Sequence, residues 1–240
     1  YPAWDCLPYD RVSPSPAVSS KRMASLAAIQ RRGEGAFIIV APITAAVQKT
    51  PPKEIIENAA LSLAPGAVME IDALTQYLSA NGYARSSTVR EPGEFAVRGG
   101  LVDIFPPGAE EPVRLDFFGD SLESVRAFDA ETQRTTRQLS GFSLAAASEI
   151  LLSEETISRF RKGYVATFGP AGDDPLYEAV SAGRTHAGAE HWLPLFYERM
   201  DTLFDFVGDA LVFMDHLAEE AAEERLVAIS DHYDARAEDA

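Results

Sequence analysis

A dense series of short apolar segments between residues 94 and 128 constrains the fold of this 240-residue chain more than any other feature. The segments EFAVR, LVDIF, PVRLDFF and SLESVRAFD are separated by Gly-Gly, Pro-Pro and Gly-Asp pairs. In the third segment, apolar residues at 113, 115 and 117 alternate with Arg114, Asp116 and Phe118. This two-residue period is typical of a strand with one buried face. Strands at this spacing predict a small antiparallel sheet.

One helix is predicted next to this sheet. Residues 70–80 place Ile71, Leu74 and Leu78 on one face, and Asn81-Gly82 is a common way to end a helix. We therefore predict a middle domain over residues 60–146, with a mostly antiparallel sheet and one helix.

The residues before this domain predict part of an α/β domain over 1–59. Ser19 or Ser20 is expected to cap a helix that runs through Arg32. The inward face of this helix would carry Met23, Leu26 and Ile29. The apolar run 36–42 (AFIIVAP) follows, and it is typical of a strand buried on both faces. A helix followed by a buried strand indicates a parallel α/β sheet.

Residues 147–240 predict a second α/β part. Ser153 and Asp174-Pro175 are expected to start helices, and LVFM (211–214) is a second candidate for a buried strand. From Asp215 onward we expect an acidic, solvated helix followed by a fraying end. The predicted fold class is α/β (mixed α+β), with parallel α/β parts on either side of the small sheet domain.

The charge of the chain is unusual and uneven. Asp and Glu number 37 against 21 Lys and Arg, so the net charge is −16. Residues 1–53 hold seven bases and three acids, whereas residues 141–240 hold seven bases and twenty acids. Binding to nucleic acid or to an anionic membrane needs clustered Lys and Arg, so the surface as a whole disfavours both.

Cysteine content and hydropathy limit the compartment. The single cysteine, Cys6, excludes an intrachain disulfide and a multi-cysteine zinc site, which favours a reducing, cytoplasmic location. No run of 18 apolar residues is present, and the first residues do not have the pattern of a signal peptide. The chain begins on Tyr1 rather than Met, which suggests a fragment.

The common catalytic motifs are missing from the sequence. None of the four lysines follows a glycine, so there is no phosphate-binding P-loop, and neither GxSxG nor GxGxxG occurs. His186 and His191 flank Glu190 without a metal-site spacing. Cys6 lies beside Trp4 and Leu7, where burial is expected rather than nucleophilic catalysis. We predict no catalytic residue, cofactor or metal site in this chain.

Several longer segments carry a resemblance to a known family. They are GEFAVRGGLVDIFPPG (93–108), PVRLDFFGDSLESVRAFDAETQR (112–134), WDCLPYDRVSPS (4–15), SSKRMASL (19–26) and HWLPLFYERMDTLFDF (191–206). Together they resemble the N-terminal module of the bacterial transcription-repair coupling factors. The excision-repair helicase UvrB is a more distant relative of this module, and the last segment favours the coupling factors.

The resemblance implies a fold and a function. Members of the family are ATP-dependent DNA translocases that displace RNA polymerase stalled at a lesion and recruit the damage-recognition protein UvrA. Their N-terminal module copies three UvrB domains: two form a degenerate helicase-like α/β fold without nucleotide motifs, and a small mixed domain lies between them in sequence. ATP, magnesium, DNA and the polymerase would then bind to domains that lie outside this chain.

The resemblance also implies which residues dock UvrA. The family's contact positions match Arg98 of FAVRGG, and Arg114 and Phe118 of PVRLDFF, while Asp116 is a weaker candidate. Strand alternation is compatible with this, because Arg114, Asp116 and Phe118 point away from the predicted core. The sequence is equally compatible with structural roles: Arg98 could pair with Asp103 or Asp116 inside the sheet, and Phe118 could cover a sheet edge.

Two alternative functions remain. A UvrB-like ATP-dependent helicase would need a P-loop outside this chain, and a direct DNA-binding domain would have to overcome the negative charge. The resemblance also implies that, in the full-length protein, the C-terminal domain masks the docking surface until the protein binds DNA and polymerase.

Overall fold

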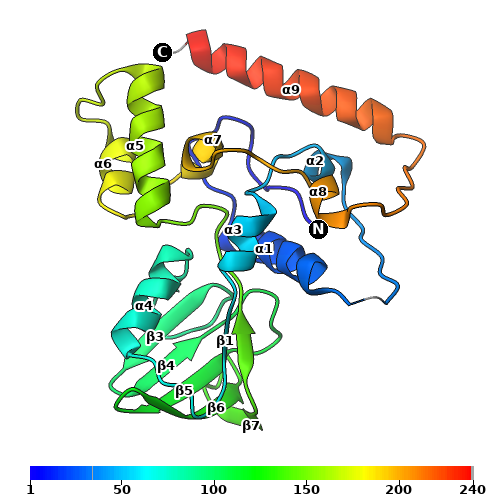
Figure 1. The fold of residues 1–240 in the computed structure, drawn as a ribbon. Coiled ribbons are helices and arrows are strands. Elements are labelled where there is room, and N and C mark those ends of the chain that lie inside the picture. Colours follow the sequence, from blue (N-terminus) through cyan, green and yellow to red (C-terminus); the bar gives the residue numbers. More distant parts are fainter. Residues whose placement is uncertain (34, 239–240) are drawn as a thin grey trace.

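The computed structural model describes residues 1–33 and 35–238. Figure 1 shows a sheet part, formed by the middle of the chain, below a helical body formed by both ends of the chain. The chain enters the sheet part along β1 (Leu61–Leu63) and leaves it along β8 (Phe142–Leu144). These two strands pair antiparallel, so the entry and exit of the sheet part lie side by side.

The main sheet has six strands in the order β2-β3-β4-β5-β6-β7. They are β2 (Ala84–Arg85), β3 (Glu94–Arg98), β4 (Leu101–Ile104), β5 (Val113–Phe118), β6 (Ser121–Phe128) and β7 (Thr135–Leu139). All neighbours are antiparallel except β2 and β3, which are parallel. Because β3 to β7 follow one another along the chain, short turns are enough to connect them.

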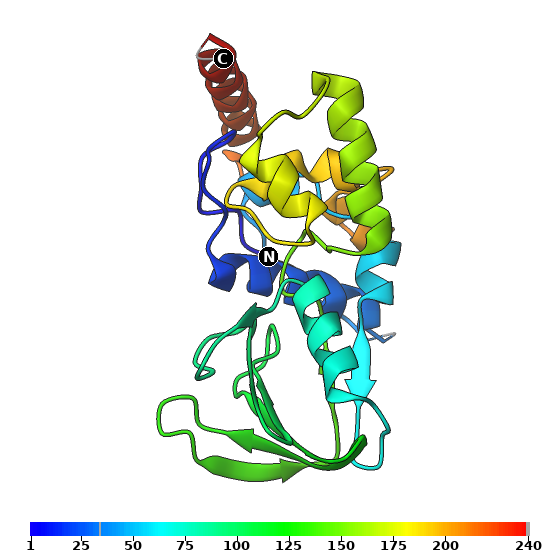
Figure 2. The ribbon, with the colours of Figure 1, turned by 90° about the vertical axis from the view of Figure 1, so that its left-hand side faces the viewer.

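One face of the sheet is covered by α4 (Ile71–Ala80), as Figure 2 shows from the side. Leu74 and Leu78 of this helix are fully buried against the fully buried Val102, Leu115 and Val125 of the strands. Each such side chain stabilises the fold by about 1.5–3 kcal/mol. We call this the inner face of the sheet, and the opposite side the outer face.

The helical body contains the remaining helices. They are α1 (Pro16–Arg31), α2 (Ile43–Ala46), α3 (Lys53–Asn58), α5 (Glu154–Phe168), α6 (Pro175–Ser181), the 3₁₀ helix η1 (Ala189–Trp192), α7 (Leu193–Phe196), α8 (Leu203–Val207) and α9 (Ala218–Glu238). One core joins α1, α3 and α8 through Leu26, Ile56 and Phe206. A second joins α5 to α7 through Phe160 and Phe196, whose ring centroids are 4.8 Å apart. The long α9 packs against α2 at the top of Figure 1.

A buried ion pair joins the segment of the helical body that precedes the sheet part in sequence to the segment that follows it. Arg22 of α1 donates to Glu149, which follows β8, at 2.5 Å, and neither side chain is accessible to solvent beyond 1%. Trp4 donates to the same carboxylate at 2.8 Å, and Arg22 donates to the carbonyl of Pro2 at 2.8 Å. With these partners the buried charges are hydrogen-bonded, which offsets the cost of taking them out of water.

The mixed α/β class and the small sheet with one helix are confirmed. Leu74 and Leu78 face inward as predicted, while Ile71 is partly buried. Ser153 and Asp174 each accept a hydrogen bond at the start of a helix, as expected for N-caps. The predicted fraying end falls at residues 239–240, outside the described residues.

The N-cap predicted for the first helix is wrong by four or five residues. The helix starts at Pro16, and the Ser15 hydroxyl accepts from the Val18 amide at 3.4 Å. Proline is well suited to the first helical position, because its missing N–H would have no partner there. Ser19 and Ser20 therefore lie within the first turns, and both are buried.

Both predicted buried strands are wrong. Residues 36–42 and 211–214 are irregular, and among the described residues no strand lies outside 61–144. Ile39 and Ala41 pack on the core of α1 and α8, but Ile38 is 92% exposed. A strand needs a neighbour to satisfy its backbone, and no neighbouring strand lies beside either segment in the described chain. The predicted parallel sheets are therefore not formed here.

Within residues 1–33 and 35–238, no helix is long and apolar enough to cross a bilayer.

Candidate functional site

The outer face of the six-stranded sheet carries all four of the predicted site residues. The register of the strands determines which side chains lie on each face of the sheet. Leu101 of β4 lies opposite both Arg98 of β3 and Asp116 of β5. Residues that face each other across an antiparallel pair point to the same side of the sheet. Arg98, Leu101 and Asp116 therefore form one row on the outer face, away from α4.

Arg114 lies in the next row, where it is held by the sheet itself. Its Nε and Nη2 donate to the two carboxylate oxygens of Asp103 at 2.7 and 2.8 Å. Its guanidinium lies 4.6 Å from the ring centroid of Phe128, and Nη1 donates to the carbonyl of Gln133 at 3.3 Å. The hydrogen bonds to Asp103 raise the pKa of Arg114 above its ordinary value.

This arrangement leaves Arg114 little freedom. Its side chain is only 17% exposed, and Asp103 is buried. A bidentate pair of this kind fixes both side chains. Arg114 thus braces the outer face, since Nε, Nη1 and Nη2 all donate to groups of the sheet part.

Arg98 is exposed and only partly held. Its Nη2 donates to the carbonyl of Ser87 at 2.6 Å and lies 3.4 Å from the Thr88 hydroxyl. A guanidinium has five N–H donors, so most of them remain for another molecule. The possible pairing of Arg98 with Asp103 or Asp116 is not found, because Arg114 and Arg126 bind those carboxylates.

Asp116 is the partner of Arg126 in β6. Arg126 Nη2 lies 3.0 Å from Asp116 Oδ2, and both side chains are partly exposed. This pair was not predicted from the sequence, because it depends on the register of β5 against β6. An ion pair at this exposure contributes about 0–1 kcal/mol to stability. The Arg126 side chain is 35% exposed and the Asp116 side chain 45%, so each is partly open to solvent.

Phe118 is the most exposed of the four residues. It ends β5 at the β5–β6 hairpin, and the residue is 82% exposed. Gly119, the next residue, has a φ of +61° that a side chain would disfavour, so the hairpin turns sharply at that point. Since β5 lies between β4 and β6, Phe118 does not cover a sheet edge.

Gly99 and Gly100 form the β3–β4 turn, where a side chain would be strained or would clash. Gly99 has a φ of +60°. A Cβ on Gly100 would lie 2.7 Å from the carbonyl oxygen of Phe117, and the Phe117 amide donates to the Gly100 carbonyl at 2.8 Å. The two glycines therefore let β4 lie close to β5.

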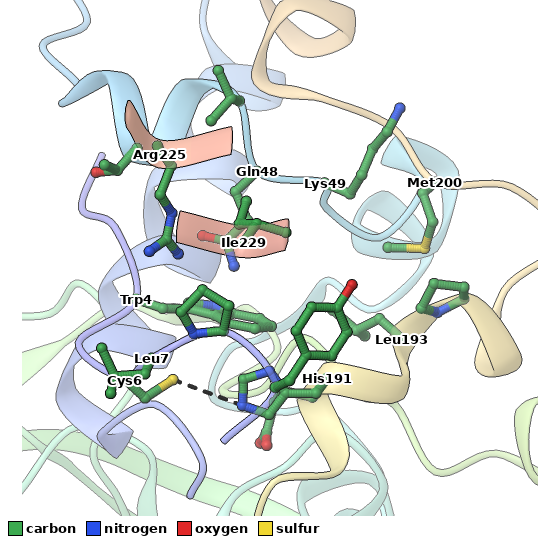
Figure 3. Close-up of a pocket in the computed structure, with 16 residues that line it drawn as sticks. Trp4, Cys6, Leu7, Gln48, Lys49, His191, Leu193, Met200, Arg225 and Ile229 are labelled. Atoms are coloured by element: carbon green, nitrogen blue, oxygen red, sulfur yellow. Dashed lines mark hydrogen bonds between the residues drawn. The ribbon is translucent and has the colours of Figure 1, made fainter. Parts of the chain in front are cut away.

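A separate cavity of about 190 Å³ lies between α9 and the rest of the helical body. Figure 3 shows Arg225 and Ile229 of α9 facing Trp4, Cys6 and His191 across it. Cys6 Sγ lies 4.0 Å from His191 Nε2. Burial raises the pKa of the Cys6 thiol to about 11, so the thiol stays protonated near neutral pH and is a poor nucleophile.

Among residues 1–33 and 35–238, no group of three or more His, Cys, Asp or Glu side chains is arranged to hold a metal ion.

The sheet part defines the class of domain to which this site belongs. Residues 61–150 match the family described as the UvrB interaction domain. The chain is also similar to transcription-repair-coupling factors over most of its length. It is 38% identical over 217 residues to the transcription-repair-coupling factor of Haemophilus influenzae, and this match covers 90% of this chain and 19% of that protein. The corresponding values are 35% over 237 residues for Rickettsia bellii (98% and 21%) and 36% over 205 residues for Escherichia coli (85% and 18%).

The chain therefore belongs to the transcription-repair-coupling factor family. It spans about a fifth of the length of these curated relatives. The resemblance identified from the sequence is confirmed. The roles of Arg98, Arg114, Asp116 and Phe118, and the domain boundaries, remain predictions.

Proposed function

We propose that this chain is the UvrA-docking module of a transcription-repair coupling factor. It recruits UvrA to RNA polymerase stalled at a lesion, in transcription-coupled nucleotide excision repair. One observation carries the proposal: the exposed Phe118 shares the outer face of the UvrB interaction domain with the exposed Arg98. An exposed aromatic ring beside an arginine is the common composition of an interface hot spot.

The four site residues have different roles in this proposal. Phe118 is the apolar anchor, and Arg98 offers free N–H donors to an acidic group or a carbonyl of UvrA. Asp116 and Arg126 present a paired charge beside them. Arg114 acts mainly as a positioning residue, because Asp103 already binds two of its donors.

The docking module itself is non-catalytic in this proposal. The sequence has no P-loop, and the protonated Cys6 offers no thiolate. ATP and magnesium would act in motor domains elsewhere in the full-length protein. DNA and RNA polymerase would be bound there too, since this chain covers only about a fifth of its relatives.

The full-length protein is proposed to mask this surface with its own C-terminal domain. An exposed Phe118 would otherwise capture UvrA without a stalled polymerase. If masking occurs, the chain of residues 1–240 binds UvrA more tightly than the resting full-length protein does. Equal affinities would contradict the masking.

The proposal is tested by Phe118→Ala against Phe213→Ala in a binding assay with UvrA. Phe213 is a matched control, because it is 89% exposed but lies in the segment between α8 and α9. We expect Phe118→Ala to weaken UvrA binding by about tenfold or more, since truncated hot spots cost at least this much, and Phe213→Ala to have no effect. Equal losses, or no loss in either variant, would contradict the proposed site.

A further inference from the structure

Val68 lies in the same row of the outer face as Phe118, although it belongs to none of the six strands. It forms an isolated antiparallel bridge with Ser121, the first residue of β6. The other neighbour of Ser121 is Phe118 of β5. Val68, Ser121 and Phe118 therefore form one row across the sheet at the β5–β6 hairpin.

Backbone hydrogen bonds fix the orientation of this row. The Met69 amide donates to the Asp120 carbonyl at 2.8 Å, and the Leu122 amide donates to the Ala67 carbonyl at 2.9 Å. These two bonds flank Val68 and Ser121, which makes them a non-hydrogen-bonded pair whose side chains lie close on one face. Ala67 and Met69, on either side of Val68, pack into the inner core instead.

Val68 consequently points to solvent on the same face as Phe118. The residue is 79% exposed, against 82% for Phe118. Two strand spacings separate these residues, which is about 10 Å. Single exposed apolar residues are common on protein surfaces, but these two are aligned across a hydrogen-bonded hairpin.

We propose that Val68 is a second apolar anchor of the docking surface, so that Val68 and Phe118 together form an apolar ridge over Ser121. This inference rests on the proposed function. It predicts that the contact region of UvrA offers apolar side chains to the ridge and an acidic or carbonyl group to Arg98. The ridge is rigid before binding, because the side chain of valine has few rotamers and the bridge holds its backbone, so little entropy is lost on docking.

The test is a calorimetric titration of UvrA with four variants of the chain: Val68→Ala, Val68→Asp, Phe118→Ala and Val40→Ala. Val40 is a matched control, because it is also 79% exposed and lies in the segment before α2, outside the sheet part. We expect Val68→Ala to weaken binding by about fivefold, from the apolar area lost. A carboxylate at position 68 must be desolvated, so Val68→Asp weakens binding by about tenfold or more. Val40→Ala leaves the affinity unchanged.

The outcomes separate this inference from the proposed function. If Phe118→Ala weakens binding while both Val68 variants bind as tightly as the unmodified chain, the ridge is wrong and the docking function stands. If neither Phe118→Ala nor the Val68 variants change the affinity, both proposals fail. Unchanged thermal midpoints are expected for the Val68 variants, because the side chain is exposed, and they exclude misfolding as the cause of a loss.

Discussion

At the scale of single residues, the outer face depends on the buried carboxylate of Asp103. It binds Arg114 at two points across the β4–β5 pair. Asp103→Asn removes the charge and one acceptor and leaves Arg114 without a full partner. We expect the free energy of unfolding to fall by about 1–3 kcal/mol. Urea unfolding measures this, and an unchanged midpoint would contradict the bracing role given to Arg114.

Arg98, unlike Arg114, contributes little to the stability of the sheet. It is exposed and binds the 87–88 loop by only one guanidinium nitrogen. Arg98→Ala therefore changes stability by no more than about 0.5 kcal/mol. Loss of UvrA binding in Arg98→Ala thus reports on docking, whereas a loss in Arg114→Ala combines docking with damage to the sheet.

Glu190 gives the chain a pH-dependent stability. Burial raises the pKa of this carboxyl above its ordinary value of 4.5, although the Ser13 hydroxyl donates to it at 2.6 Å. The folded state therefore holds this proton more tightly than the unfolded state does. Stability from Glu190 is present below pH 4.5 and falls as the pH rises through the raised pKa.

The variant Glu190→Gln isolates this effect, because it cannot ionise. We expect the stability of the variant, relative to the unmodified chain, to increase as the pH rises from 4.5 and then to level off. Urea unfolding of both proteins at several pH values measures the difference. A difference that stays constant across this range would show that Glu190 ionises as readily when folded as when unfolded.

At the scale of helices and strands, local sequence patterns predicted correctly the features that depend on residues close together in the chain. The inward face of α4, the caps at Ser153 and Asp174, and the alternation along β5 all depend on near neighbours in sequence. The segments 36–42 and 211–214 failed because a buried strand also depends on partners that a local pattern does not contain. Local reasoning also missed Val68, because its bridge to Ser121 joins residues far apart in the chain.

For the candidate site, too, the sequence predicted the local features but not those that depend on strand pairing. Alternation was sufficient to expect Phe118 and Asp116 on one face. The pairs Asp103–Arg114 and Asp116–Arg126 needed the register of three strands, which two hairpins and a bulge between Asp116 and Phe117 determine. The sequence therefore indicated which residues face outward, but not which of them are already bound to one another.

The exposed segment between α8 and α9 gives a prediction at this scale. Phe213 contributes nothing to the core, whereas Phe206 of α8 is 5% exposed and packs on α1. Phe213→Ser should leave the free energy of unfolding within about 0.5 kcal/mol of the unmodified value. Phe206→Ser should lower it by about 3 kcal/mol or more, since a large core side chain is lost. Similar losses in both variants would mean that residues 209–217 are packed.

At the scale of the whole molecule, the acidity of the chain is compatible with protein docking. Twenty of the 37 acids lie after residue 140, mostly in the helical body and α9, whereas Arg98 and Arg126 lie on the outer face of the sheet. The net charge of −16 opposes the release of counterions that drives binding to DNA. We expect no retention of duplex DNA at physiological salt in a gel-shift assay, and salt-dependent retention would favour the DNA-binding alternative.

The helicase alternative has an equally direct test. The chain lacks a P-loop, and a phosphate-binding lysine is needed to hold the β- and γ-phosphates in that class of enzyme. We expect no phosphate release above the blank when the chain is incubated with ATP and magnesium. Turnover that persists through purification would contradict the assignment of a non-catalytic docking module.

The central claim is that the outer face of the middle sheet binds UvrA through exposed side chains. The most direct measurement is the calorimetric titration of UvrA with the unmodified chain, with Arg98→Ala and with Arg184→Ala, an exposed arginine of the helical body. We expect saturable binding for the unmodified chain and for Arg184→Ala, and an affinity about tenfold lower or worse for Arg98→Ala. Equal affinities for all three proteins, or no binding by the unmodified chain, would contradict the claim.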